Sequence, residues 1–190
     1  MLLSVIAAMA IGATPPAEPV KWAIDPVHSE ILFRIRHFVT KVPGTFTQWA
    51  GTITADPARL DGGTVEVTIQ STSINTGNER RDNDLRSANF FAVDSFPTIT
   101  FKSTRVEVTG TDIKVTGDFT LRGVTKSIVL KGEFGGTAGP PEAGKQRIGF
   151  TAGTKINRLD YGVKWNMLVE GSRMLGDEVE ITLNIEAKRQ

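Results

Sequence analysis

The two histidines of the chain, His28 and His37, are the residues best suited to acid-base or metal chemistry. They lie at either end of one candidate strand, residues 29–38, and that strand separates them by roughly 30 Å. The two rings therefore cannot share a metal ion through the strand, and no HExxH or comparable ligand spacing is present. The simplest interpretation is that each histidine caps a strand or bonds to a loop, and we predict no metal site.

The side chains that serve as nucleophiles or phosphate cradles show no catalytic pattern. The chain has no cysteine, which excludes thiol nucleophiles, disulfides and zinc–cysteine sites. There is no GxSxG elbow, no GxxxxGK[ST] loop and no GxGxxG after a strand. Asp82 and Asp84 are two residues apart, so on a helix they point to different faces and do not form a dyad. The sequence favours a protein that is not an enzyme; an acid-base site assembled from distant residues is the alternative.

A charged run, Glu79-Arg80-Arg81-Asp82, is a further candidate for chemistry. Its ordinary role is a solvated helix face with weak local ion pairs. In the alternative, Arg80 or Arg81 lies at the mouth of a container and holds a phosphate or polar head by charge-assisted hydrogen bonds. Trp165 is expected as a packed plug at one end of the fold, with contact to a membrane or guarding of an entrance as alternatives.

Strands joined by short turns make up most of the chain and must position these residues. Alternation of apolar and polar residues predicts strands at 21–25, 29–38, 45–55, 63–71, 98–109, 112–121, 125–134, 147–155 and 178–187. The expected turns are Asp25-Pro26, Pro43-Gly44, Asp56-Pro57, Asp61-Gly62-Gly63, Gly110-Thr111-Asp112 and Arg122-Gly123, with a Pro/Gly-rich hairpin loop at 135–144. A helix is predicted over 78–91, and Phe90, Phe91 and Phe96 are expected to anchor it.

The length of the strands indicates the fold. Closely spaced strands with short turns predict an antiparallel barrel or sandwich. Several strands run about ten residues, roughly 30 Å, against a usual length of about five or six. About eight such strands closed on themselves give an interior just wide enough for packed side chains or one slim ligand. We therefore predict an all-β fold, an antiparallel barrel of about eight strands with one short helix between strands; a sandwich is the second choice.

The inward-facing residues follow from the same alternation. They form apolar stripes, namely Ile31, Phe33 and Ile35; Val65, Val67 and Ile69; Val115, Phe119 and Leu121; Ile128 and Leu130; Ile148, Phe150 and Ala152; and Val179, Ile181, Leu183 and Ile185. Residue types alone favour a filled core, because protein interiors normally close to high density. A hollow interior is the alternative, and composition does not decide between the two.

The charge balance bears on the partners of the protein, and residues 1–13 bear on its location. The 22 Lys and Arg nearly balance the 21 Asp and Glu, which argues against a nucleic-acid partner. Residues 1–13, MLLSVIAAMAIGA, are too short to span a bilayer but typical of the apolar region of a secretory signal, without its usual basic start. Small residues at Ala8-Met9-Ala10 or Gly12-Ala13 suit cleavage. We expect residues 1–19 to be a signal peptide and spacer, and residues 20–190 to be a single periplasmic or secreted domain.

Together these segments resemble the YceI-like family, exported lipocalin-like barrels described as polyisoprenoid-binding. The resemblance covers about residues 22–187 and rests on an ordered set of short motifs. These are Asp25-Pro26-Val27-His28-Ser29, Phe33-Arg34-Ile35-Arg36-His37, Gly44-Thr45-Phe46, Ser73-Ile74-Asn75-Thr76, Arg81-Asp82, Leu85-Arg86-Ser87, Phe90-Phe91, Phe96-Pro97, Phe101, residues 117–126 and Arg158-Leu159-Asp160-Tyr161-Gly162. The family often has a histidine in the segment Arg-Asp-x-His-Leu, and the corresponding residue here is Asp84.

The resemblance implies a hydrophobic tunnel that holds an isoprenoid chain, such as a quinone or polyprenyl tail, and no other cofactor. The leading hypothesis is a non-catalytic carrier for such a lipid, with transient membrane contact and an oligomeric state left open, a dimer included. The alternatives are an enzyme acting on a lipid head group and an interaction module for a membrane redox protein. The expected ligand-binding residues are Phe33, Ile35, His37, Val67, Arg81, Phe101, Phe119, Leu121, Ile128 and Phe150, with Arg81 and His37 at the polar end.

Overall fold

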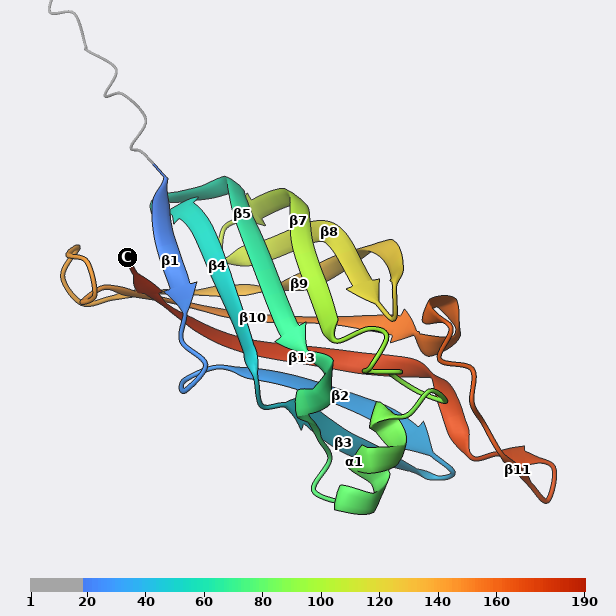
Figure 1. Ribbon diagram of the computed structural model, residues 1–190. Helices are drawn as coiled ribbons and strands as arrows, with labels where there is room; N and C mark the ends of the chain where they lie inside the picture. Colours follow the sequence, from blue (N-terminus) through green and yellow to red (C-terminus); the bar gives the residue numbers. More distant parts are fainter. Residues whose placement is uncertain (1–18) are drawn as a thin grey trace, which may run out of the picture.

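A computed structural model describes residues 19–190, and the predicted signal segment lies outside the described residues. The described chain is almost entirely strand (Figure 1). The strands are β1 (Val20–Ile24), β2 (Glu30–His37), β3 (Thr40–Phe46), β4 (Trp49–Asp56), β5 (Arg59–Gln70), β6 (Ile74–Asn75), β7 (Thr98–Thr109), β8 (Asp112–Leu121), β9 (Val124–Ala138), β10 (Arg147–Asn157), β11 (Leu168–Val169), β12 (Ser172–Arg173) and β13 (Leu175–Arg189). The helices are α1 (Glu79–Arg86) and the 3-10 turns η1 (Ser71–Ser73) and η2 (Arg158–Tyr161).

Eight of these strands close into an antiparallel barrel, which confirms the predicted fold. Their order is β1-β4-β5-β7-β8-β9-β10-β13, and β13 pairs back onto β1. The long strand β13 makes this closure at residues 187–189. Over residues 175–184 the same strand pairs with β2 instead, so that β2, β3 and β6 extend the wall at one end (Figure 1). Among the described residues, no helix is long and apolar enough to span a bilayer.

Two predicted turns are wrong. Residues 45–55 were expected as one strand after a Pro43-Gly44 turn, but β3 contains both residues and β4 begins only at Trp49. At Pro43, β3 pairs with β2 on one side only, and such an edge is where a strand tolerates proline. The segment Asp61-Gly62-Gly63 lies inside β5, where the register with β4 shifts between Thr54 and Asp56. The loop expected at 135–144 is also shifted, because β9 continues to Ala138.

The helix is shorter than the predicted 78–91. Asn78 caps its start, because the Asn78 side chain accepts a hydrogen bond from the backbone N–H of Arg81. It ends at Arg86, and Ser87 is extended, with its hydroxyl donating to the carbonyl of Asp84 at 2.6 Å. A serine that bonds to nearby backbone in this way competes with helical hydrogen bonding. Residues 87–96 therefore form turns, which place Phe90 and Phe91 toward the barrel.

Candidate binding cavity

The inward-facing stripes enclose a cavity of about 470 Å³. It runs from Leu60 and Val106, at one end of the barrel, to His37 and Arg81, at the end covered by α1. Most of its lining side chains are apolar. The structure brings all ten residues expected to bind ligand to this one surface. They are Phe33, Ile35 and His37 on β2, Val67 on β5, Arg81 on α1, Phe101 on β7, Phe119 and Leu121 on β8, Ile128 on β9 and Phe150 on β10.

Two glycines explain how aromatic rings lie along the wall and not across the middle. Gly44 is opposite Phe33 in the β2–β3 pair, and a Cβ on Gly44 would collide with the Phe33 ring. A Cβ on Gly117 would lie 2.5 Å from Cζ of Phe101. Each ring thus covers a glycine across the sheet and leaves the centre open. The interior is hollow, contrary to the filled core that residue types favour. Of the predicted inward stripes, only Ile148 packs elsewhere, in a cluster with Trp22.

Aromatic residues line the end of the cavity beside α1. The Phe91 ring meets Phe46 edge-on at 6.0 Å between centroids, and the Phe90 ring lies 5.1 Å from that of Trp165. We call α1 and the turns at 87–96 the lid. Phe90, Phe91 and Trp165 all line the cavity, so the two phenylalanines anchor the lid, as predicted, and also face the hollow interior. Phe96 is not among the lining residues and instead packs against Gly123.

Hydrogen bonds fix this lid to the barrel. Arg86 donates from Nε to the carbonyl of Thr72 at 2.8 Å and from Nη2 to that of Ile74 at 3.0 Å. Arg122, at the turn between β8 and β9, donates to the carbonyls of Ala88 and Gly162. The end of α1 and the segment after it are therefore connected to two separate parts of the barrel.

The polar side chains that line the cavity lie mainly beside this lid. Arg81 donates from Nε to Oγ1 of Thr76 at 2.7 Å and from Nη2 to the Thr76 carbonyl at 2.8 Å. The Thr76 backbone N–H in turn donates to the buried carboxylate of Asp82 at 2.9 Å. The other polar residues of this set are His37, Asp84, Ser87 and Asn89. An amphiphile in the cavity would thus find hydrogen-bonding groups at one end and apolar side chains along the rest.

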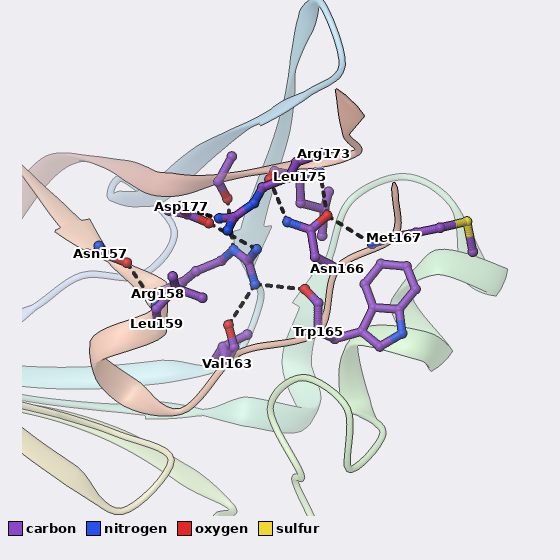
Figure 2. Close-up of polar contacts among 11 residues, drawn as sticks. Asn157, Arg158, Leu159, Val163, Trp165, Asn166, Met167, Arg173, Leu175 and Asp177 are labelled. Atoms are coloured by element: carbon purple, nitrogen blue, oxygen red, sulfur yellow. Dashed lines mark hydrogen bonds and ion pairs between the residues drawn. The ribbon is translucent and has the colours of Figure 1, made fainter. Parts of the chain in front are cut away.

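Asp84, Ser87 and Asn89 line the cavity and are exposed, so the cavity opens beside α1, and we call this end the mouth. A buried arginine, which the sequence motifs include without indicating its partners, holds the loop beside it. Arg158 is 3% exposed and donates to the carbonyls of Val163, Trp165 and Gly176 at 2.6, 2.8 and 2.8 Å (Figure 2). Burial lowers the pKa of its guanidinium, and Asp177 opposes that shift; an arginine nevertheless stays charged at neutral pH. Because its partners are mostly backbone carbonyls, no pattern of side chains could have identified them.

His28, the histidine that does not line the cavity, belongs to a separate surface cluster. Nδ1 of His28 lies 3.0 Å from Oδ2 of Asp25, and ligand-type atoms of these residues and of Glu186 lie within 4.8 Å of one another. The hydrogen bond to Asp25 raises the pKa of His28, and the same bond lowers that of Asp25. Glu186 is too distant in sequence to have been predicted here. None of the three lines the cavity, so the cluster does not face a ligand held there.

Comparisons with known proteins agree with this architecture. A YceI-like domain profile matches residues 22–187. The chain is 37% identical over 164 residues to the protein YceI of Escherichia coli, covering 86% of this chain and 83% of that one. The chain belongs to the YceI-like family.

Solved structures related to this YceI-like chain share its fold. The YceI protein of Campylobacter jejuni is 32% identical, with a TM-score of 0.71 over 82% of this chain and 90% of its own. A polyisoprenoid-binding domain from Saccharophagus degradans, implicated in plant cell wall breakdown, has a TM-score of 0.66 at 17% identity over 90% and 99% of the two chains. The latter similarity bears on the fold alone.

Proposed function

We propose that this YceI-like protein is a non-catalytic carrier that holds an isoprenoid lipid, or a similarly slim amphiphile, inside its barrel. The observation that carries the proposal is the apolar cavity of about 470 Å³ that follows the barrel interior. This volume falls within the range of about 300–1,000 Å³ common for small-ligand sites, which are mostly apolar with a few polar groups. Burial of a tail there contributes roughly 25 cal/mol per Å² of apolar surface removed from water.

The proposed ligand has an apolar chain and a polar head. The chain occupies the hollow between the stripes, and the head lies by Arg81, Asp84 and His37, where the lining becomes polar. A quinone and a polyprenyl compound both satisfy this description. The polyisoprenoid-binding domain of the same fold supports extending that ligand class to this chain as part of the proposal.

The other two hypotheses draw less support from the structure. An interaction module would be favoured by a filled barrel, and the interior is hollow. An enzyme acting on a bound lipid needs a cluster of reactive groups that faces it. The Asp25–His28–Glu186 cluster does not line the cavity, and His37, which does, forms no side-chain hydrogen bond with another of residues 19–190. We therefore propose no second function.

We further propose that the protein is exported to the periplasm or secreted. The proposal rests on the apolar residues 1–13 and on the small residues among them, Ala8-Met9-Ala10 or Gly12-Ala13. Fractionation of cells, followed by N-terminal sequencing of the purified protein, tests it. Recovery of a full-length chain from the cytoplasm alone would contradict export and leave the carrier proposal untouched.

Filling the cavity from one wall tests the carrier proposal. Ala152 lines the cavity, while the preceding residue on β10, Thr151, is exposed on the outside. We expect Ala152→Phe to abolish the lipid that native mass spectrometry or gentle organic extraction recovers with the wild type, and to abolish binding of added quinone or polyprenol. The control Thr151→Phe should bind as the wild type does. Equal binding by both variants, or no lipid bound by the wild type, would contradict the proposal.

A further inference from the structure

The exposed apolar side chains of the barrel gather at one place. Among residues 19–190, five large hydrophobic side chains are strongly exposed, and four belong to two hairpins at the same end. Val39, in the β2–β3 turn, is 94% exposed, and Met167, Leu168 and Val169 are 50%, 69% and 41% exposed. The fifth, Val27, lies beyond the opposite end of β2. We call the four clustered residues the apolar tip; exposed groups of this kind mark contact sites.

The base of the longer hairpin is firmly held. The backbone N–H of Phe38 donates to the Met174 carbonyl at 2.8 Å, which joins the two hairpins, and that of Met174 donates to the Met167 carbonyl at 2.9 Å. The Asn166 side chain bonds both backbone groups of Leu175, at 2.9 and 3.0 Å (Figure 2). The side chain of Met167 points away from this network (Figure 2). The hairpin is therefore a fixed support.

The end of the same hairpin is uncovered on both faces. Neighbouring residues of a strand point to opposite faces, and both Leu168 and Val169 on β11 are exposed. Glu170 and Gly171 connect β11 to β12 with φ of 51° and 79°, as in a tight two-residue hairpin turn. The tip thus projects as a narrow wedge, which differs from the flat patch of a protein–protein interface.

The apolar tip stands beside the mouth of the cavity. Trp165, two residues before Met167, lines the cavity and contacts Phe90 of the lid. Leu175, just after the hairpin, also lines the cavity and pairs with His37. Figure 1 shows the β2–β3 turn, α1 and β11 at this same end of the barrel. A surface that meets the tip therefore lies close to the mouth.

The charges around the tip are mainly positive. Segments 34–41 and 164–174 contain five lysines and arginines and one carboxylate, Glu170. Two of these cations are paired, Lys41 with Glu180 at 2.6 Å and Arg173 with Asp177 at 2.9 Å. Five positive charges against three negative ones leave an excess of two. Such an excess is attracted to the anionic lipids of a bilayer surface.

We propose that the apolar tip docks the mouth of the barrel onto a bilayer that contains anionic lipids, where cargo enters and leaves. This inference rests on the carrier function proposed above. A stable protein interface buries about 800 Å² per partner, which four side chains on two narrow turns do not supply. A wedge of apolar residues flanked by cations suits the boundary between head groups and acyl chains. Contact there also shortens the path of an insoluble tail through water.

Single cysteines in this cysteine-free chain allow the docking to be located. An environment-sensitive fluorophore on Leu168→Cys should shift to the blue with vesicles of phosphatidylcholine and phosphatidylglycerol. The same label on Val27→Cys, in the same full chain, should not shift, which separates docking by the tip from adhesion by residues 1–18. Because of the excess positive charge, we expect the affinity for vesicles of phosphatidylcholine alone to be lower by about tenfold or more. A label at 168 that stays in water, or that shifts no more than the label at 27, would overturn the proposal.

A charge placed on the tip tests whether docking serves loading. Leu168→Asp should slow transfer of quinone from those vesicles about tenfold or more, and the control Val27→Asp should not. Both variants should bind quinone delivered in detergent micelles as the wild type does, so failure of docking is distinguishable from failure of the carrier function. Unchanged transfer by Leu168→Asp would refute the proposal. A dimer that Leu168→Asp dissociates would also refute it, because a second copy would then cover the tip.

Discussion

At the scale of single residues, two opposite charges stand at the polar end of the cavity. Arg81 is held there by Thr76, whereas Asp84, also lining the cavity, is exposed. A carboxylate near a bound phosphate disfavours it, while a neutral head such as a quinone is little affected. The carboxylate of Asp84 should therefore make this chain less suited to phosphorylated heads.

Replacement of the carboxylate tests this selectivity. Asp84→Asn should raise the affinity for a polyprenyl phosphate by about two- to fivefold, since one charge in water at about 4 Å is worth roughly 1 kcal/mol. The affinity for a quinone should stay the same. Titrations that follow quenching of the tryptophan fluorescence, to which Trp49 and Trp165 contribute from the cavity lining, measure both affinities. Asp94→Asn, an exposed position outside the cavity lining, is the control; equal effects of the two substitutions would refute the selectivity.

The Asp25–His28 pair predicts the direction in which the stability of the fold changes with pH. The pKa of His28 is raised above its ordinary 6.5, chiefly by the hydrogen bond to Asp25. Its contribution to stability is therefore complete below 6.5 and is lost as pH rises through the folded pKa. The pKa of Asp25 is lowered from 3.8 by the same bond, so that its contribution is lost as pH falls through the lowered value.

The measurement is a titration of the His28 ring by NMR. Asp25→Asn should lower the pKa of His28, because the neutral amide no longer favours the imidazolium. A His37→Asn variant assigns the remaining ring signal to His28. An unchanged pKa in Asp25→Asn would mean that the ring and the carboxylate do not pair in solution.

At the scale of elements, the Arg158 clamp connects the loop at 163–165 to the start of β13. Arg158→Met would leave three carbonyls without their donor, and a buried group left unsatisfied costs about 1–3 kcal/mol. We expect a loss of about 2–4 kcal/mol in the free energy of unfolding, measured by denaturant titration. Arg173→Met removes an exposed ion pair with the same Asp177 and should cost less than about 1 kcal/mol. Equal losses in the two variants would exclude a clamp.

The elements also separate what the sequence indicates from what only folding decides. β7 and β8 have their predicted bounds, 98–109 and 112–121, because each alternating segment ends at a glycine turn, although the register between the two strands shifts between Ser103 and Arg105. β3 was missed because Pro43-Gly44 has the composition of a turn, although pairing with β2 and space for the Phe33 ring place both residues in a strand.

The same distinction holds for the cavity. A period of two was enough to choose the eight apolar residues that share its surface, whereas His37 and Arg81 were chosen as polar groups for its end. The hollow itself depends on closure of the barrel and on aromatic rings that cover glycines across the sheet, as the Phe101 ring covers Gly117. These relations join residues that are distant in sequence, so alternation cannot show them. The contact of Trp165 with Phe90 belongs to the same class. The partners of Arg158 were missed for another reason, because backbone carbonyls leave no pattern in the side chains.

At the scale of the whole molecule, the barrel encloses a cavity that the proposed lipid would fill. Ligand that binds only the folded state raises the free energy of unfolding by RT ln(1 + [L]/Kd), about 2.7 kcal/mol at a hundredfold excess over Kd. The unfolding temperature of the delipidated protein should therefore rise when quinone is added. It should continue to rise with the logarithm of the quinone concentration.

Variants locate the source of that shift. Ala152→Phe fills the lumen, so it should start closer to the ligand-bound stability and gain almost nothing from added quinone. Thr151→Phe, on the outer face of the same strand, should keep the full shift. If Ala152→Phe gained as much stability as the wild type, the lipid would be stabilising some other surface, and the barrel would not be a container. If Thr151→Phe keeps the quinone-dependent rise in unfolding temperature and Ala152→Phe loses it, the ligand stabilises the barrel from inside the cavity.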